Sequence, residues 1–266
     1  MTQVISRDGT PIVYERFGSG PVVVLVGGGL DDGTENGPLA QELAEGFTAV
    51  NYARRGRAGS GDVQPYAVER EIEDLAALID VVGGPVHLFG ASSGGALVLE
   101  AAAAGLSVDK VAVFDVPYAT REPAVQAWRN YVGQLRAALA VGRRGEALRL
   151  FMRLAGASDQ DIAGAESSPM WPALLELAHT LAYDAACLAD GPPPVARLAT
   201  ITQPTLVVTG SGIDPHMAGL ESDYFSQAAD AIVACVTHAE RRIVNVREHA
   251  VNAKVLAPVL TGFFRP

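Results

Sequence analysis

The segment Gly90-Ala91-Ser92-Ser93-Gly94 constrains the fold of this chain more than any other feature. It follows an apolar run, 86–89, that is typical of a buried strand. It precedes an alanine-rich stretch, 94–104, that is apolar on all sides and so typical of a buried helix. Glycines two residues before and after the serine let the chain turn without side-chain clash. The pattern predicts a sharp strand–turn–helix that presents the Ser92 hydroxyl at the carboxyl edge of a sheet. The alternative is a tight turn rich in small residues that carries no chemistry.

Strand-like and helix-like segments alternate on both sides of this turn. A hairpin is expected at 4–6 and 11–17, and further strands at 22–26, 48–51, 86–89, 111–114, 205–209 and 241–246. Helices are expected at 38–45, 68–82, 94–104 and 222–236, with one more at the end of the chain. This alternation predicts an α/β fold in which helices cover both faces of a mostly parallel, eight-stranded sheet.

The alternation stops in the middle of the chain. Residues 118–200 contain no convincing strand and read as amphipathic helices at 124–140, 146–155 and 172–188. We therefore expect a core formed by 1–117 and 201–266, with 118–200 inserted as a helical cap. The cap holds many of the aromatic residues, among them Trp128, which is a candidate substrate-binding residue.

A nucleophilic serine needs a base, and the base needs an acid that orients it. In folds of this type the chain order is serine, acid, histidine. His249 lies between the last strand and the last helix, where the base belongs. Asp214 lies in the loop after 205–209 and is the preferred acid. The sequence therefore predicts Ser92, Asp214 and His249 as a catalytic triad.

Two further residues stay open as candidates. Asp115 ends the strand 111–114 and is a second choice for the acid, although it could equally be a loop carboxylate beside Pro117. His216, close to Asp214, is a candidate for the substrate pocket.

A run of three glycines follows the strand 22–26 and predicts an oxyanion site. Glycine lets backbone N–H groups approach a substrate closely. We expect the N–H groups of Gly29 and Ser93 to form the oxyanion hole, with Gly28 and Leu30 as neighbours that contact substrate. No metal site is expected.

The only basic cluster is the loop 54–62, which contains Arg54, Arg55 and Arg57. It could hold a carboxylate or a phosphate. The favoured interpretation is a solvated loop that Asp62 and nearby acids fix and that braces the glycine run.

Composition excludes several classes of protein. With 20 basic and 30 acidic residues the net charge is −10, which disfavours nucleic-acid binding. No apolar run is long enough for a membrane span. The two cysteines are far apart, no signal peptide is recognised, and a cytoplasmic protein is expected. We expect no cofactor and a small-molecule substrate as partner, with a homodimer left open.

Taken together, these motifs resemble the α/β-hydrolase superfamily, and within it a bacterial serine hydrolase or esterase-like group with a Tyr-x-Arg-Arg-Gly-Arg loop. That loop reads Tyr52-Ala53-Arg54-Arg55-Gly56-Arg57 here. The turn around Ser92, the Asp214 loop, the His249 turn and the closing apolar helix match in order. The family usually has histidine where this chain has Gly27.

The resemblance implies a serine hydrolase that forms an acyl-enzyme. Its substrate is expected to be a small to medium, largely apolar ester, lactone or thioester. Two alternatives remain. The same triad can serve a C–C bond hydrolase or another biosynthetic catalyst, and the fold can also bind a ligand without catalysing a reaction.

Overall fold

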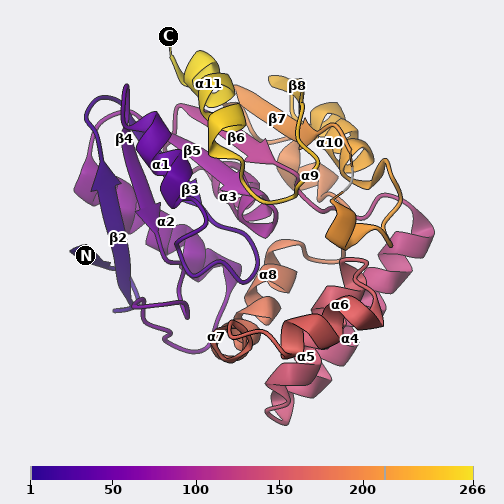
Figure 1. Cartoon of the computed structure of the whole chain (residues 1–266). Coiled ribbons are helices and arrows are strands. Elements are labelled where there is room, and N and C mark those ends of the chain that lie inside the picture. Colours follow the sequence, from indigo (N-terminus) through magenta and orange to yellow (C-terminus); the bar gives the residue numbers. More distant parts are fainter. Residues whose placement is uncertain (1, 213, 266) are drawn as a thin grey trace.

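The computed structural model describes residues 2–212 and 214–265 and shows an α/β fold with one eight-stranded sheet (Figure 1). The strands are β1 (Thr2–Ile5), β2 (Pro11–Phe17), β3 (Val22–Val26), β4 (Thr48–Tyr52), β5 (Val86–Ala91), β6 (Lys110–Phe114), β7 (Thr205–Gly210) and β8 (Ala239–Val244). Their order in the sheet is β1-β2-β4-β3-β5-β6-β7-β8. β1 and β2 are antiparallel to their neighbours and all other pairs are parallel. The fold class expected from the sequence is confirmed.

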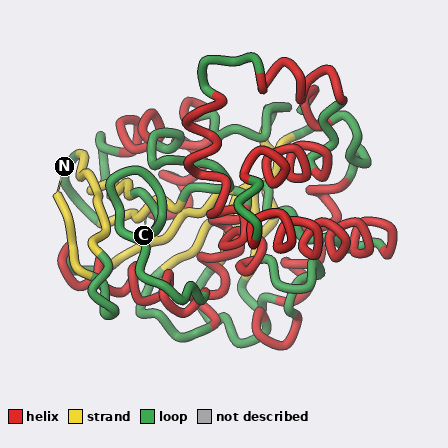
Figure 2. Tube along the Cα trace, turned by 90° about the horizontal axis from the view of Figure 1, so that it is seen from below, coloured by secondary structure: helices red, strands yellow, loops and turns green. Residues whose placement is uncertain are grey.

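Alternate side chains of the central strands enter two separate cores. Val23 and Leu25 of β3 pack on the face covered by α1 (Gly37–Leu43) and α11 (Ala253–Phe264). Val24 and Val26 face α2 (Val68–Val82), α3 (Ser93–Ala103) and α10 (Tyr224–Cys235). Helices therefore lie on both sides of the strands (Figure 2). Burial on both faces explains why these strands are continuous apolar runs.

The segment between β6 and β7 is helical. It contains α4 (Glu122–Ala140), α5 (Arg144–Leu154), α6 (Asp159–Glu166), α7 (Trp171–Leu177), η1 (Ala178–Thr180), α8 (Leu181–Cys187) and α9 (Val195–Leu198). Helices α4 to α8 gather below the sheet in Figure 1. The single helix expected at 172–188 is divided into α7, η1 and α8.

Two other expectations need correction. Helix α6 was not predicted, because it has no apolar stripe and buries only Ile162. Its start is nevertheless encoded by a capping box between Ser158 and Asp161. The last strand, β8, begins two residues before the expected 241–246. Its start is hard to recognise in the sequence because an edge strand with mostly exposed side chains has no apolar run.

The three arginines of the basic loop 54–62 are not solvated, contrary to expectation. Arg54, Arg55 and Arg57 are each at most 2% exposed. A buried guanidinium must be paired, and the partners come from α2, the first turn and α8. Arg54 binds both carboxylate oxygens of Glu71 at 2.7 Å. The remaining pairs are Arg55 with Asp74 and Asp8, and Arg54 and Arg57 with Asp184.

The same loop braces the glycine run, as expected. Arg54 donates to the carbonyl of Gly27 at 3.3 Å, and Arg57 donates to the carbonyl of Gly28. Only glycine fits at position 27, because the Asp31 carboxylate occupies the space that a Cβ there would need. The arginine loop therefore connects the glycine run to α2 through buried hydrogen bonds.

Within the described part of the chain, no helix is both long enough and apolar enough to cross a membrane.

The Arg54–Glu71 pair gives a prediction for stability. Burial alone raises the pKa of Glu71, but the Arg54 charge and its hydrogen bonds outweigh burial and hold that pKa below its usual value. Glu71→Gln should lower the free energy of unfolding by roughly 3–5 kcal/mol at neutral pH, because it removes the bidentate one of the two carboxylates that pair with the buried Arg54 guanidinium.

The pH dependence follows from the lowered pKa. A carboxylate whose pKa is depressed by folding stabilises above its unfolded pKa of about 4.3 and loses that contribution as pH falls through the folded pKa. The difference between wild type and Glu71→Gln in urea unfolding should therefore shrink in acid. Glu69→Gln, at an exposed position of the same helix, is the control and should change little. A difference that stays constant with pH would contradict this assignment.

Candidate active site

Ser92 lies at a strained turn between β5 and α3. Its φ of 53° and ψ of −127° are rare for a residue with a side chain. The Ser92 N–H donates to the Phe114 carbonyl of β6 at 2.9 Å, which ties the turn to the sheet. A Cβ on Gly94 would lie 2.5 Å from the carbonyl oxygens of Val26 and Gly27, so only glycine fits there. The predicted strand–turn–helix is present, with Ser92 at its apex.

Two backbone N–H groups lie beside Ser92 with no partner of their own. Among the described residues, neither Gly29 N–H nor Ser93 N–H donates a hydrogen bond. Ser93 is the first residue of α3, where the helix dipole favours negative charge. Gly28 packs against the serine so closely that a Cβ there would lie 3.0 Å from the Ser92 Cβ. This arrangement can accept an oxyanion on a group bonded to Ser92.

A cavity of about 130 Å³ lies between these groups and helices α4, α5 and α8. Gly28, Gly29, Ser92, Ser93 and His249 line it from the side of the sheet. Its other walls are mainly apolar and include Trp128, Tyr131, Phe151, Leu154, Leu181 and Leu188. The walls thus suit an apolar ligand of modest size.

His249 lies in this cavity and is held by two contacts. Its ring stacks on Phe225, with centroids 4.7 Å apart and an interplanar angle of 18°. Its Nδ1 atom is 3.4 Å from the Asp115 Oδ2 atom but has no hydrogen-bond partner among the described residues, so this contact is a close approach of the two side chains. Asp115 is 4% exposed, and its other oxygen accepts the Gly210 N–H at 3.2 Å. The imidazole therefore faces a buried, fixed carboxylate.

Asp214, the acid favoured from the sequence, contacts the backbone instead of the imidazole. Its carboxylate accepts the N–H of His216 at 2.8 Å and the N–H of His249 at 3.0 Å. It thereby caps the short helix η2 (Pro215–Met217) and anchors the chain that carries His249. Chain order could not separate the two acids, because Asp115 and Asp214 both lie between the serine and the histidine.

The structure places the other predicted residues as follows. Trp128, Gly28, Gly29 and Ser93 line the cavity. His216 is exposed and is not part of the lining, and Leu30 packs against the core instead of the cavity. In the part of the chain that is described, no three His, Cys, Asp or Glu side chains group as metal ligands would.

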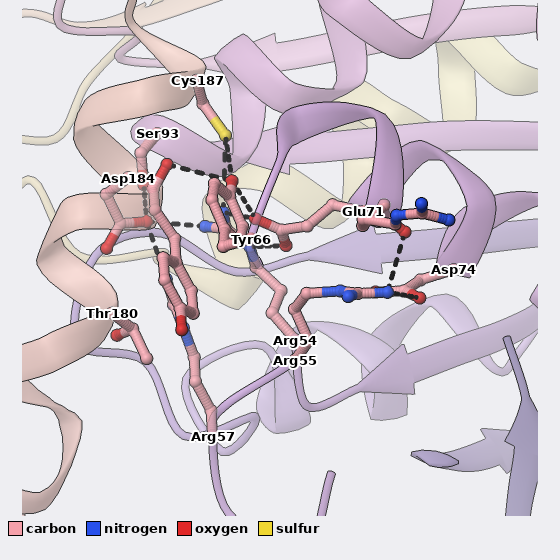
Figure 3. Close-up of polar contacts among 12 residues, drawn as sticks. Arg54, Arg55, Arg57, Tyr66, Glu71, Asp74, Ser93, Thr180, Asp184 and Cys187 are labelled. Atoms are coloured by element: carbon pink, nitrogen blue, oxygen red, sulfur yellow. Dashed lines mark hydrogen bonds and ion pairs between the residues drawn. The ribbon is translucent and has the colours of Figure 1, made fainter. Parts of the chain in front are cut away.

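Asp184 was missed in the sequence and is central to the site. It comes from α8, and its Oδ1 atom accepts the Ser93 hydroxyl at 2.8 Å and one donor each from Arg54 and Arg57 at 2.7 Å (Figure 3). The sequence feature that could have revealed Asp184 is its position on the same face of the helix as Leu181 and Leu188, because a carboxylate on an apolar face is buried and needs partners.

Glu35 is a second carboxylate of the cavity that the sequence did not reveal. Burial, and then the nearby Asp31 charge, raise its pKa. It accepts the Val251 N–H at 3.4 Å, two residues beyond His249.

Comparisons with known proteins identify the family and the fold. A model of the alpha/beta hydrolase family matches residues 22–251. An alpha/beta hydrolase from Sphaerobacter thermophilus DSM 20745 is 44% identical, with a TM-score of 0.85 over 99% of this chain and 100% of that one.

More distant similarities show the fold alone. A thermophilic esterase from Thermogutta terrifontis is 16% identical, with a TM-score of 0.68 over 99% of this chain and 97% of that one. An enol-lactonase from Burkholderia xenovorans LB400 is 18% identical, with a TM-score of 0.68 over 98% of this chain and 99% of that one.

Among curated proteins, the uncharacterized hydrolase YraK of Bacillus subtilis is 35% identical over 96 residues. That match covers 35% of this chain and 35% of YraK, so the chain spans about a third of its relative's length. Because the family model extends over most of the sequence, the chain belongs to the alpha/beta hydrolase family.

Proposed function

We propose that this protein is a serine hydrolase that cleaves ester-like bonds through an acyl-enzyme. The observation that carries the proposal is the meeting of Ser92, at its strained turn, and His249, backed by Asp115, in one cavity. Ser92 is the nucleophile, His249 the general base, and Asp115, in place of Asp214, the acid that orients the imidazole.

In this mechanism His249 removes the Ser92 proton while Oγ attacks the substrate carbonyl carbon. Asp115 stabilises the imidazolium that forms. The imidazolium then gives its proton to the leaving alcohol or thiol, which departs as the acyl-enzyme forms. Water, activated by the same imidazole, attacks the acyl group and releases the carboxylic acid. In the resting structure the Ser92 hydroxyl forms no hydrogen bond with any described residue, so the contact to His249 must shorten when substrate binds.

The oxyanion of each tetrahedral intermediate is assigned to the N–H groups of Gly29 and Ser93. Both line the cavity on either side of Ser92 and both are free to donate. Removal of one such donor typically costs about 10²–10³ in rate.

The substrate class follows from the cavity walls. Apolar and aromatic side chains of the cap helices, Trp128 and Phe151 among them, face Ser92 across the cavity. We therefore assign residues 118–200 as the cap that shapes the acyl site. An ester, lactone or thioester of small to medium size fits these walls.

The nucleophile is tested by covalent labelling. A fluorophosphonate probe should modify the wild type, because activated serines attack phosphorus, and peptide mass spectrometry should locate the phosphonate on Ser92. Ser92→Ala should abolish labelling, whereas Ser211→Ala, a serine outside the cavity, should label as the wild type does. An unlabelled wild type would refute the proposal and favour a protein that binds a ligand without catalysis. Labelling that survives in Ser92→Ala would show that Ser92 is not the nucleophile.

The choice of acid is tested by two matched variants. Asp115→Asn removes the charge facing the imidazole and should lower kcat for an aryl ester by about 10²–10⁴-fold, with KM little changed. Asp214→Asn removes only a charge next to backbone N–H groups, so its kcat should fall less than tenfold. The reverse order of effects would restore Asp214 as the acid.

A further inference from the structure

One buried oxygen of the cavity has no role in the proposed mechanism. Asp184 is 5% exposed, and its Oδ1 atom already accepts three hydrogen bonds. Its Oδ2 atom, by contrast, has no hydrogen-bond partner among residues 2–212 and 214–265. An orphaned carboxylate oxygen is costly to bury, so its presence needs a reason.

The orphaned oxygen lies on the side of the cavity and the oxyanion donors. Figure 3 shows it pointing away from the contacts that Oδ1 makes with Ser93 and the arginines. A Cβ built on Gly29 would lie 3.5 Å from Oδ2, and both Gly29 and Asp184 line the cavity. A group bound next to the Gly29 N–H would therefore be within reach of Oδ2.

Because Asp184 is ionised, its Oδ2 atom can only accept hydrogen bonds. Burial by itself raises the pKa of Asp184, but the Arg57 and Arg54 charges and the Ser93 hydroxyl outweigh it, and the pKa is lowered. An ionised carboxylate offers lone pairs and no proton.

The neighbouring arginines do not offer their charge to the cavity. Arg54 is committed to Glu71, Asp184 and the Gly27 carbonyl, and Arg57 to Asp184 and the carbonyls of Gly28 and Asp31. Neither arginine lines the cavity. A ligand therefore meets an acceptor and not a cation, which disfavours anionic groups at this point.

We propose that Asp184 Oδ2 is a substrate-binding acceptor that selects acyl groups bearing a hydroxyl close to the reacting carbonyl. The inference rests on the proposed function, since the oxyanion donors fix the carbonyl beside Gly29. It narrows the substrate from apolar esters in general to hydroxyacyl esters, whose chain lies on the apolar wall and whose hydroxyl donates to Asp184.

Five aryl esters test this selection in the wild type. They are the p-nitrophenyl esters of butyrate, 2- and 3-hydroxybutyrate, and 2- and 3-methoxybutyrate. Each methoxy ester matches the electronic effect of its hydroxy partner but cannot donate a hydrogen bond. At one of the two positions the hydroxy ester should exceed the methoxy ester in kcat/KM by about 10- to 100-fold, the range for a hydrogen bond to a charged group. Equal values at both positions would overturn the proposal.

A variant then assigns the preference to Asp184. In Asp184→Asn the amide oxygen must accept from the arginines, so the amide N–H₂ faces the cavity as a donor. The hydroxy-to-methoxy ratio should fall to about one or below. Asp74→Asn is the matched control, because it removes a buried carboxylate from the same arginine loop, is outside the cavity lining, and should leave the ratio unchanged. A ratio that persists in Asp184→Asn would overturn the assignment.

Binding to Ser92→Ala separates the two proposals. Calorimetry should show the preferred hydroxy ester binding at least tenfold more tightly than its methoxy partner, with no hydrolysis required. If the wild type neither labels nor hydrolyses any ester, the proposed function fails while this measurement still decides the role of Asp184. If the wild type hydrolyses every ester equally, the function stands and the selection by Asp184 fails. The wild-type and Ser92→Ala data remain decisive even if Asp184→Asn does not fold.

Discussion

The buried carboxylate of Asp184 is the interaction on which the arrangement of the cavity depends. Through one oxygen it joins α8 to the arginine loop and to the Ser93 hydroxyl. The arginines that it pairs also hold the carbonyls of the glycine run. Helix α8, the glycine run and the first residue of α3 are therefore joined by a single network of buried charges. Because Asp184 Oδ2 and Arg57 Nε have no hydrogen-bond partner among the described residues, the network contributes to geometry more than to stability.

The sheet supplies the second constraint. Ser92 and Asp115 follow adjacent parallel strands, and both have left-handed φ values, 53° and 47°. Each donates its N–H to the next strand along, Ser92 to Phe114 and Asp115 to Val208. The hydrogen bonds between the strands thus continue past the strand ends and hold Ser92 and Asp115 in their strained conformations. Strained residues persist at functional sites when the surrounding structure fixes them in this way. His249 comes from a loop and is positioned by its contacts with Phe225, Asp115 and the Asp214 carboxylate.

The sequence predicts those structural features that depend on residues close together in the chain. Apolar continuity identified the central strands, and small residues around Ser92 identified the turn. The choice of Asp115 over Asp214 depends on which loop approaches the imidazole, a tertiary property that chain order does not carry. The burial of Arg54, Arg55 and Arg57 was missed because three arginines read as a solvated surface until their partners on α2 and α8 are known. Asp184 was missed for the same reason, since its partners are far away in sequence.

A crystal structure of the protein after reaction with a fluorophosphonate tests the proposed site most directly. We expect phosphorus on Ser92 Oγ, a phosphoryl oxygen within hydrogen-bond distance of Gly29 N–H and Ser93 N–H, and His249 Nδ1 bonded to Asp115. An adduct on any other residue, or an imidazole turned to Asp214, would contradict the proposed triad.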